Sequence, residues 1–236
     1  MKRSAVLFWV SLFSIAMGLF ECIVVIYLRK IYYPEGFCFP LKIMEPDIIT
    51  VELLREAATV IMLLAIGAIS GKTSVEKFGW FIYSFAILDI FYYIFLKLLI
   101  GWPESLMTWD ILFLIPATWT GPVVAPLINS ITMIILAWLI ISSKLPSKQP
   151  VVKPHEWALL ITGALVVIIS YTLDYTRFMT EKHSFHELFD PSCSTAVIGT
   201  AVSYSPVSFP WLVFSTGVLL HLTAIALIAW RKFRKS

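Results

Sequence analysis

Long apolar segments alternate with short polar connections along almost the whole of this chain. A helix needs about 20 apolar residues to cross a bilayer, whose hydrocarbon core is about 30 Å thick. Six segments are long and apolar enough, so we expect six membrane-spanning helices. They run from Ser4 to Leu28, from Glu52 to Ser70, from Phe78 to Ile100, within Ile111 to Ile141, from Trp157 to about Phe178, and from about Phe209 to Trp230.

The connections between these segments are too short to hold a soluble domain, since domains typically have about 50–250 residues. The sequence shows no internal repeat and no low-complexity tract. The predicted fold class is therefore an all-α integral membrane protein, with residues 1–236 as a single transmembrane helical bundle. The first segment is longer than a signal-peptide core and has no small-residue cleavage site after it, so we expect it to be retained as a helix.

The fourth apolar segment is too long for one span. As a single helix, residues 111–141 would extend about 46 Å at about 1.5 Å per residue. Gly121-Pro122 offers a natural break, because proline ends or kinks a helix, and Val123 to Ile141 can cross the membrane alone. The preceding piece, Leu106 to Ala117, is too short to cross. We expect it to form a re-entrant or interfacial half-helix, anchored at the lipid head groups by Trp102, Trp109 and Trp119; the alternative is one kinked helix.

The overall composition agrees with this class. Hydrophobic residues make up 59% of the chain and charged residues only 14%, whereas soluble domains carry about 25% charged residues. No basic run is long enough to follow a phosphate backbone, which argues against nucleic acid as a partner. The lipid bilayer is the expected partner, and other membrane subunits remain a further option.

Basic residues predict the orientation, because Lys and Arg favour the cytoplasmic ends of spanning helices. If both termini are cytoplasmic, most of the basic residues fall on the inner side, where only Glu76 and Glu156 are acidic. The compact loops favour the plasma membrane of a prokaryote. The inner basic residues are then Lys2, Arg3, Lys72, Lys77, Lys144, Lys148, Lys153, Arg231, Lys232, Arg234 and Lys235.

The second segment opens with charged residues on one helix face. Glu52, Arg55 and Glu56 are spaced i, i+3 and i+4, so all three point the same way. Arg55 can pair with either carboxylate but cannot satisfy both fully. We therefore expect a cation from another helix, and Lys97 and Arg177 are the candidates.

Further ionisable residues lie within or near the other spans. Each costs about 2.5–3.5 kcal/mol at membrane depth on insertion scales, so it tends to face the bundle interior and find a partner. Asp89, Tyr93 and Lys97 recur every four residues on one face of the third segment. Glu21 lies in the first segment, and Asp174 lies near the outer end of the fifth.

Two interpretations of these residues remain open. In the first, they form structural ion pairs that fix the order of the helices. In the second, they converge on an outward-facing polar pocket that binds a small ligand, an ion or a proton. The candidate site residues are Glu21, Glu52, Arg55, Glu56, Asp89, Tyr93, Lys97, Asp174 and Arg177.

The predicted outer loops carry two weaker signals. Cys38 and Cys193 would both lie in an oxidising compartment and could form a disulfide, although two unpaired cysteines are the alternative. His183 and His186, with Glu187 or Asp190, have the side chains of a zinc-type site, but solvated loop residues would look the same.

Other cofactor chemistry finds little support. Membrane-embedded b-type haem usually needs two histidines on facing helices, and only His221 falls at membrane depth, which argues against an intramembrane bis-His haem.

Three functional classes remain for the protein. The first is binding or passage of a small ligand, ion or proton. The second is a non-catalytic accessory or assembly subunit of a larger membrane complex. The third is a membrane-embedded enzyme that uses pocket carboxylates or a His-bound metal.

Overall fold

The computed structural model describes residues 2–42, 44–115, 117–143, 150–184, 186–187 and 194–234. It is mostly helical, and six of its helices are long and apolar enough to cross a membrane, which confirms the predicted spans. A short seventh helix, α6 (Ser194–Val202), lies outside this set. The six long helices are α1 (Arg3–Tyr32), α2 (Pro46–Ser70), α3 (Ser74–Ile100), α4 (Val124–Ile141), α5 (Pro154–Lys182) and α7 (Trp211–Phe233).

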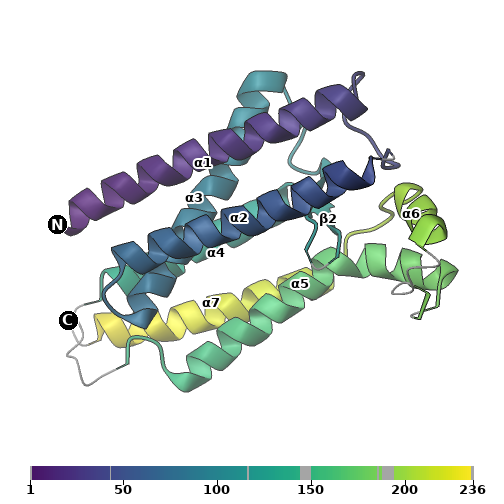
Figure 1. The fold of residues 1–236 in the computed structure, drawn as a ribbon. Helices are drawn as coiled ribbons and strands as arrows, with labels where there is room; N and C mark the ends of the chain where they lie inside the picture. Colours follow the sequence, from purple (N-terminus) through teal and green to yellow (C-terminus); the bar gives the residue numbers. More distant parts are fainter. Residues whose placement is uncertain are drawn as a thin grey trace.

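Helix α3 is the centre of the larger part of the bundle, because α1, α2 and α4 all pack against it. Helices α5 and α7 form a second packed pair. Helix α7 contacts α4, and α5 contacts the strand β2 (Trp119–Pro122) just before α4. Both chain ends lie at one end of the bundle, which we call the terminus end, while α6 lies at the opposite end (Figure 1).

The α5–α7 pair packs closely because two glycines face each other. A Cβ atom on Gly163 would lie 2.9 Å from the carbonyl oxygen of Gly217, and a Cβ on Gly217 would lie equally close to that of Gly163. Small residues allow such backbone contact between membrane helices, where van der Waals packing replaces the hydrophobic effect as the main attraction.

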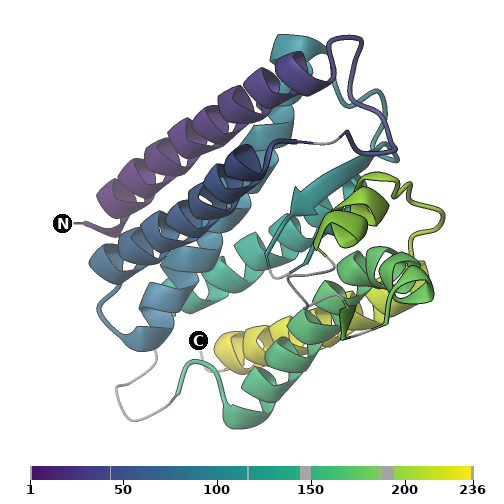
Figure 2. The same ribbon diagram turned by 45° about the vertical axis from the view of Figure 1, so that its right-hand side comes forward.

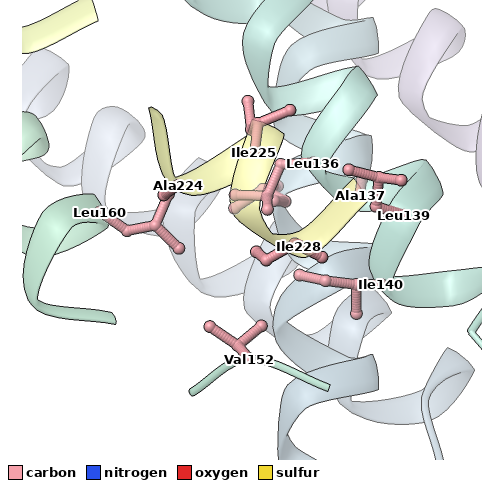
Figure 3. Close-up of a cluster of buried hydrophobic side chains, with 10 residues drawn as sticks. Leu136, Ala137, Leu139, Ile140, Val152, Leu160, Ala224, Ile225 and Ile228 are labelled. Atoms are coloured by element: carbon pink, nitrogen blue, oxygen red, sulfur yellow. The ribbon is translucent and has the colours of Figure 1, made fainter. Parts of the chain in front are cut away.

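The terminus end holds the largest apolar cluster and a buried ion pair. Aliphatic side chains from α4, α5 and α7, among them Leu136, Leu160 and Ile228, pack together there (Figure 3). Beside them, Arg231 donates to both carboxylate oxygens of Glu156, at 2.7 and 2.9 Å. This pair ties α7 to the start of α5.

The half-helix expected over Leu106 to Ala117 is not confirmed. Instead, β1 (Trp109–Phe113) and β2 (Trp119–Pro122) pair as an antiparallel hairpin, which lies beside α6 in Figure 2. A lone half-helix leaves backbone groups unpaired at both ends, whereas the two strands satisfy each other, and aromatic and β-branched residues favour strands. We call the end of the bundle that contains this hairpin the hairpin end.

The predicted break at Gly121-Pro122 is confirmed, since β2 ends at Pro122 and α4 begins at Val124. Hydrogen bonding continues across the junction. The amides of Val123 and Val124 donate to the carbonyls of Thr108 and Leu106, at 3.0 and 2.8 Å. The hairpin is therefore joined to the first turn of α4 without a gap in its backbone hydrogen bonds.

Candidate functional site

A cavity of about 330 Å³ lies at the hairpin end, between α1, α2, the hairpin and the α5–α6 region. Its walls are mostly aliphatic and aromatic, and charged side chains from α1, α2 and β1 line part of its surface. The residues around it are Val25, Leu28, Arg29, Tyr32, Tyr33, Phe37, Leu41, Lys42, Met44, Ile49, Glu52, Arg55, Glu56, Tyr92, Asp110, Ile111, Leu114, Thr118, Tyr175, Ile198, Ala201 and Val202.

A smaller cavity of about 120 Å³ adjoins the first, deeper between α1, α2 and α3. Val25, Arg55, Glu56, Tyr92 and Ile111 line both cavities and therefore form the boundary between them. The remaining residues around the smaller cavity are Glu21, Thr59, Val60, Leu63, Phe85, Leu88, Asp89, Tyr93, Leu112 and Phe113.

Arg55 joins α1 to α2 in this region. Its Nε donates to Glu52 at 2.8 Å, and its Nη1 donates to Glu21 on α1. Thr59, one turn further along α2, donates to the other oxygen of Glu21 at 2.5 Å. One guanidinium thus serves two carboxylates, and both carboxylates are buried.

Glu56 is bound differently from its neighbours on α2. Its side chain is only 6% exposed, and its two oxygens accept the single backbone N–H of Leu114, at 3.1 and 3.0 Å. Within the described residues no basic side chain lies within ion-pair distance of this carboxylate. Glu56 therefore fixes the end of β1 while keeping acceptor capacity on a cavity wall.

Asp89 lines the smaller cavity near the middle of α3. One of its carboxylate oxygens accepts the hydroxyl of Ser130 on α4, at 2.7 Å. In the part of the chain that the structure describes, Asp89 also has no ion-pair partner. The buried Glu56 and the half-buried Asp89 thus line the same small cavity, and neither has an ion-pair partner among the described residues.

Arg29, near the end of α1, anchors the hairpin. Its Nη2 donates to Asp110 of β1 at 3.0 Å, and Tyr93 donates to the other oxygen of that carboxylate at 3.2 Å. The guanidinium also lies over the rings of Trp102 and Phe37, at 3.7 and 4.6 Å from their centres. Burial raises the pKa of Asp110 to about 6, while the Arg29 charge opposes that rise.

The other side of the hairpin is held by hydroxyl groups. The hydroxyls of Thr120 and Tyr204 lie 2.9 Å apart, and Tyr204 donates to Asp174 on α5 at 2.8 Å. The backbone N–H of Val207 also donates to Asp174. Burial raises the pKa of Tyr204, so its hydroxyl stays a proton donor. Asp174 therefore has a structural contact here and lines neither cavity.

The two cations expected to neutralise the α2 carboxylates lie elsewhere. Lys97 donates to the backbone carbonyls of Gly101 and Pro103, at 3.0 and 2.8 Å, at the end of its own helix. Arg177 is exposed on α5. Neither residue lines a cavity, while Glu21, Glu52, Arg55, Glu56, Asp89 and Tyr93 do.

Arg29 and Asp110 belong to the site although the sequence pattern did not predict them there. Arg29 follows Glu21 by eight residues, about two helical turns, and so lies on the same face of α1. Asp110 is the only charged residue between Glu104 and Lys144. Arg29 lies just beyond the predicted first span, and Asp110 lies in a segment expected to be interfacial. Neither was therefore counted among the charges at membrane depth.

The loop candidates remain predictions. His183 lies 3.7 Å from Glu187 and contacts Thr200 at 2.7 Å, but the described residues contain no group of three candidate metal ligands. Asp190 and Cys193 lie outside the described residues, so the structure does not test the Cys38–Cys193 disulfide.

No protein-family model matches the chain, and comparisons with curated proteins and with solved structures found no match either.

Proposed function

We propose that the protein is a multi-pass membrane protein that binds a small ligand in the two adjoining cavities at its hairpin end. The observation that carries this proposal is the larger cavity itself. Small-molecule sites are typically clefts of about 300–1,000 Å³ with mostly apolar walls and a few converging polar groups. The larger cavity has about this volume, such walls, and Glu52, Arg55 and Glu56 on one of its sides.

The charges around the cavities support binding more than a purely structural role. Structural ion pairs in a membrane would be expected to balance, since each unpaired charge is expensive there. Five carboxylates line the two cavities, against three basic side chains, namely the guanidiniums of Arg29 and Arg55 and the exposed ammonium of Lys42. The carboxylates are Glu21, Glu52, Glu56, Asp89 and Asp110.

Filling the larger cavity should abolish binding. Ala201 of α6 lines the cavity, and an Ala201→Trp side chain would occupy it. Gly199, two residues earlier, is exposed and has no atom within 4 Å of an added Cβ, so Gly199→Trp is the matched control. The probes are three 12-carbon amphiphiles, dodecylammonium, dodecanol and dodecanoate, offered to the protein in phosphatidylcholine nanodiscs and detected by native mass spectrometry.

We expect at least one probe to be retained by the unmodified protein and by the Gly199→Trp variant, and to be lost from Ala201→Trp. Retention of every bound probe by Ala201→Trp would place it on the lipid-facing surface and contradict the proposal, as would the failure of all three probes to bind.

The proposal includes an orientation in which the hairpin end, and with it the pocket, faces outward from a prokaryotic plasma membrane. Both chain ends lie at the other end (Figure 1), where Lys2, Arg3, Lys72 and Lys77 give the positive charge that favours the cytoplasm. A reporter fused after Ser236 should therefore be active only in the cytoplasm. Activity of a periplasmic reporter at that position would show that the proposed orientation is wrong.

A further inference from the structure

We infer that the ligand is a bilayer-dissolved amphiphile with a positively charged amine head group, held by Glu52 and Glu56 of α2. This inference rests on the proposed function and names the ligand class for the same cavity. Three features of the hairpin end lead to it: the occupied guanidiniums, the free carboxylate capacity, and the aliphatic side of the cavity between α2 and α6.

The two guanidiniums of the site already have carboxylate partners. Arg29 pairs with Asp110 and stacks on Trp102, and Arg55 bonds both Glu21 and Glu52. An anionic head group that paired with either guanidinium as its carboxylates do would displace one of them and leave it uncompensated. Donors left for an anion include Nη1 of Arg29 and the exposed ammonium of Lys42, and neither residue belongs to α2. Removing one partner from a buried pair is strongly unfavourable, so the side of the cavity formed by α2 disfavours carboxylate and phosphate head groups.

The carboxylates of α2, in contrast, can still accept further hydrogen bonds. A carboxylate has about four acceptor positions, and Glu56 uses its oxygens on only one described donor, the N–H of Leu114. In Glu52, the bond from Arg55 reaches Oε2. An ammonium group has three donors and forms its strongest hydrogen bonds with carboxylates in a desolvated site.

Aromatic rings add to the recognition of a cation. Tyr92 and Tyr175 line the same cavity as the two glutamates, and ring faces attract ammonium groups most when water is excluded. A neutral alcohol head would gain neither the charge-assisted hydrogen bonds nor this attraction. The polar side of the cavity therefore favours a cationic head group over a neutral polar one.

Aromatic contacts on the segment that joins α1 to α2 cover part of the route from water to the cavity. Phe37 contacts Trp102 with ring centres 6.1 Å apart, and Phe39 contacts Tyr204 at 6.2 Å. Between α2 and α6, however, the lining residues Ile49, Ile198 and Val202 are aliphatic, and Ile198 is 40% exposed. Access is therefore easiest for a molecule with an apolar chain that arrives from the bilayer.

The test compares head groups at constant chain length. Dissociation constants are measured for dodecylammonium, dodecanol and dodecanoate in phosphatidylcholine nanodiscs at neutral pH, each corrected for partition into nanodiscs without protein. We expect dodecylammonium to bind at least about tenfold more tightly than dodecanol, because a hydrogen bond to a charged group contributes about 1.5–3 kcal/mol, and dodecanoate to bind most weakly.

Glu56→Gln and Glu52→Gln should each weaken dodecylammonium binding by at least about tenfold and leave dodecanol binding unchanged. Glu56→Gln keeps a carbonyl oxygen for the N–H of Leu114. Glu52→Gln is the second variant in case the first fails to fold, since it keeps a carbonyl oxygen for Arg55, whose charge stays paired with Glu21. The control is Asp47→Asn, which removes a carboxylate from an exposed position of α2 outside the cavity.

The outcomes separate this inference from the proposed function. If dodecanol or dodecanoate binds as tightly as dodecylammonium and is displaced by Ala201→Trp, the cavity binds ligands but the cationic class is wrong. The same conclusion follows if neither glutamine variant affects dodecylammonium. If no probe depends on the cavity, both the inference and the proposed function fail.

Discussion

Arg29 is the side chain through which α1 holds the hairpin. It is 8% exposed and Asp110 is 2% exposed, so both charges of this pair have been removed from water and from lipid head groups. Such a pair gains little net stability over apolar replacements, but it becomes unfavourable when one partner is lost. The position of β1, and with it one wall of both cavities, therefore depends on the pair remaining intact.

Arg29→Met should consequently lower the free energy of unfolding by about 3–5 kcal/mol, since it leaves Asp110 buried without its cation. The double variant Arg29→Met with Asp110→Leu should recover most of this loss. The measurement is equilibrium unfolding in mixed micelles or bicelles. Lys30→Met removes the neighbouring exposed charge and should change the unfolding free energy by no more than about 0.5 kcal/mol.

A result in which the single and double variants lose equal stability would show that the buried carboxylate is not the cause. The hairpin would then be held by the Thr120–Tyr204 contact and by the backbone bonds to α4.

Residue spacing predicted some of these contacts and not others. The i, i+3 spacing of Glu52 and Arg55 indicated a local pair, and the structure contains it. The link from Arg55 to Glu21 joins two helices, and spacing within one helix carries no information about such contacts. Lys97 was expected to serve α2, but its own helix end offered two carbonyl acceptors nearer by.

At the scale of elements, the hairpin is the part of the fold that hydropathy did not predict. The apolar length of residues 111–141 required a break, and Gly121-Pro122 located it correctly. Length alone could not decide between a half-helix and two strands, because both are short, apolar and bounded by prolines. The strands prevail because β2 provides β1 with a backbone partner, and unpaired backbone groups are costly in lipid.

The hairpin also explains why polar residues can gather at this end. Irregular backbone is tolerated at membrane depth only where protein covers it or where it lines a cavity. Here the strands are covered by Trp119 stacked on Tyr171, with ring centres 5.8 Å apart, and by the contacts of Asp110 and Thr120. The uncovered part, around Ile111 and Leu114, lines the larger cavity.

At the scale of the whole molecule, the six spans were the most predictable feature. In lipid, a single segment can satisfy its own backbone hydrogen bonds only as a helix. The side chains that face the lipid must also be apolar, so long apolar segments predict the spans directly. The difference in packing between the two ends of the bundle was not predictable. The terminus end is filled by the cluster around Leu136 and Ile228, whereas the hairpin end contains the two cavities.

This asymmetry is the basis of the functional account, because a bundle needs only packing and ion pairs to be stable. The terminus end has both, in its apolar cluster and in the Glu156–Arg231 pair. The hairpin end instead keeps open volume beside carboxylates that lack a cation among the described residues. We attribute that difference to a bound ligand.

The most direct measurement is an experimental density map of the protein in phosphatidylcholine nanodiscs, determined with and without dodecylammonium. We expect density for the added molecule in the larger cavity, with its head group between Glu52 and Glu56 and its chain directed toward Ile198. A cavity that is closed by side chains in both maps, with Glu56 in an ion pair, would contradict this expectation.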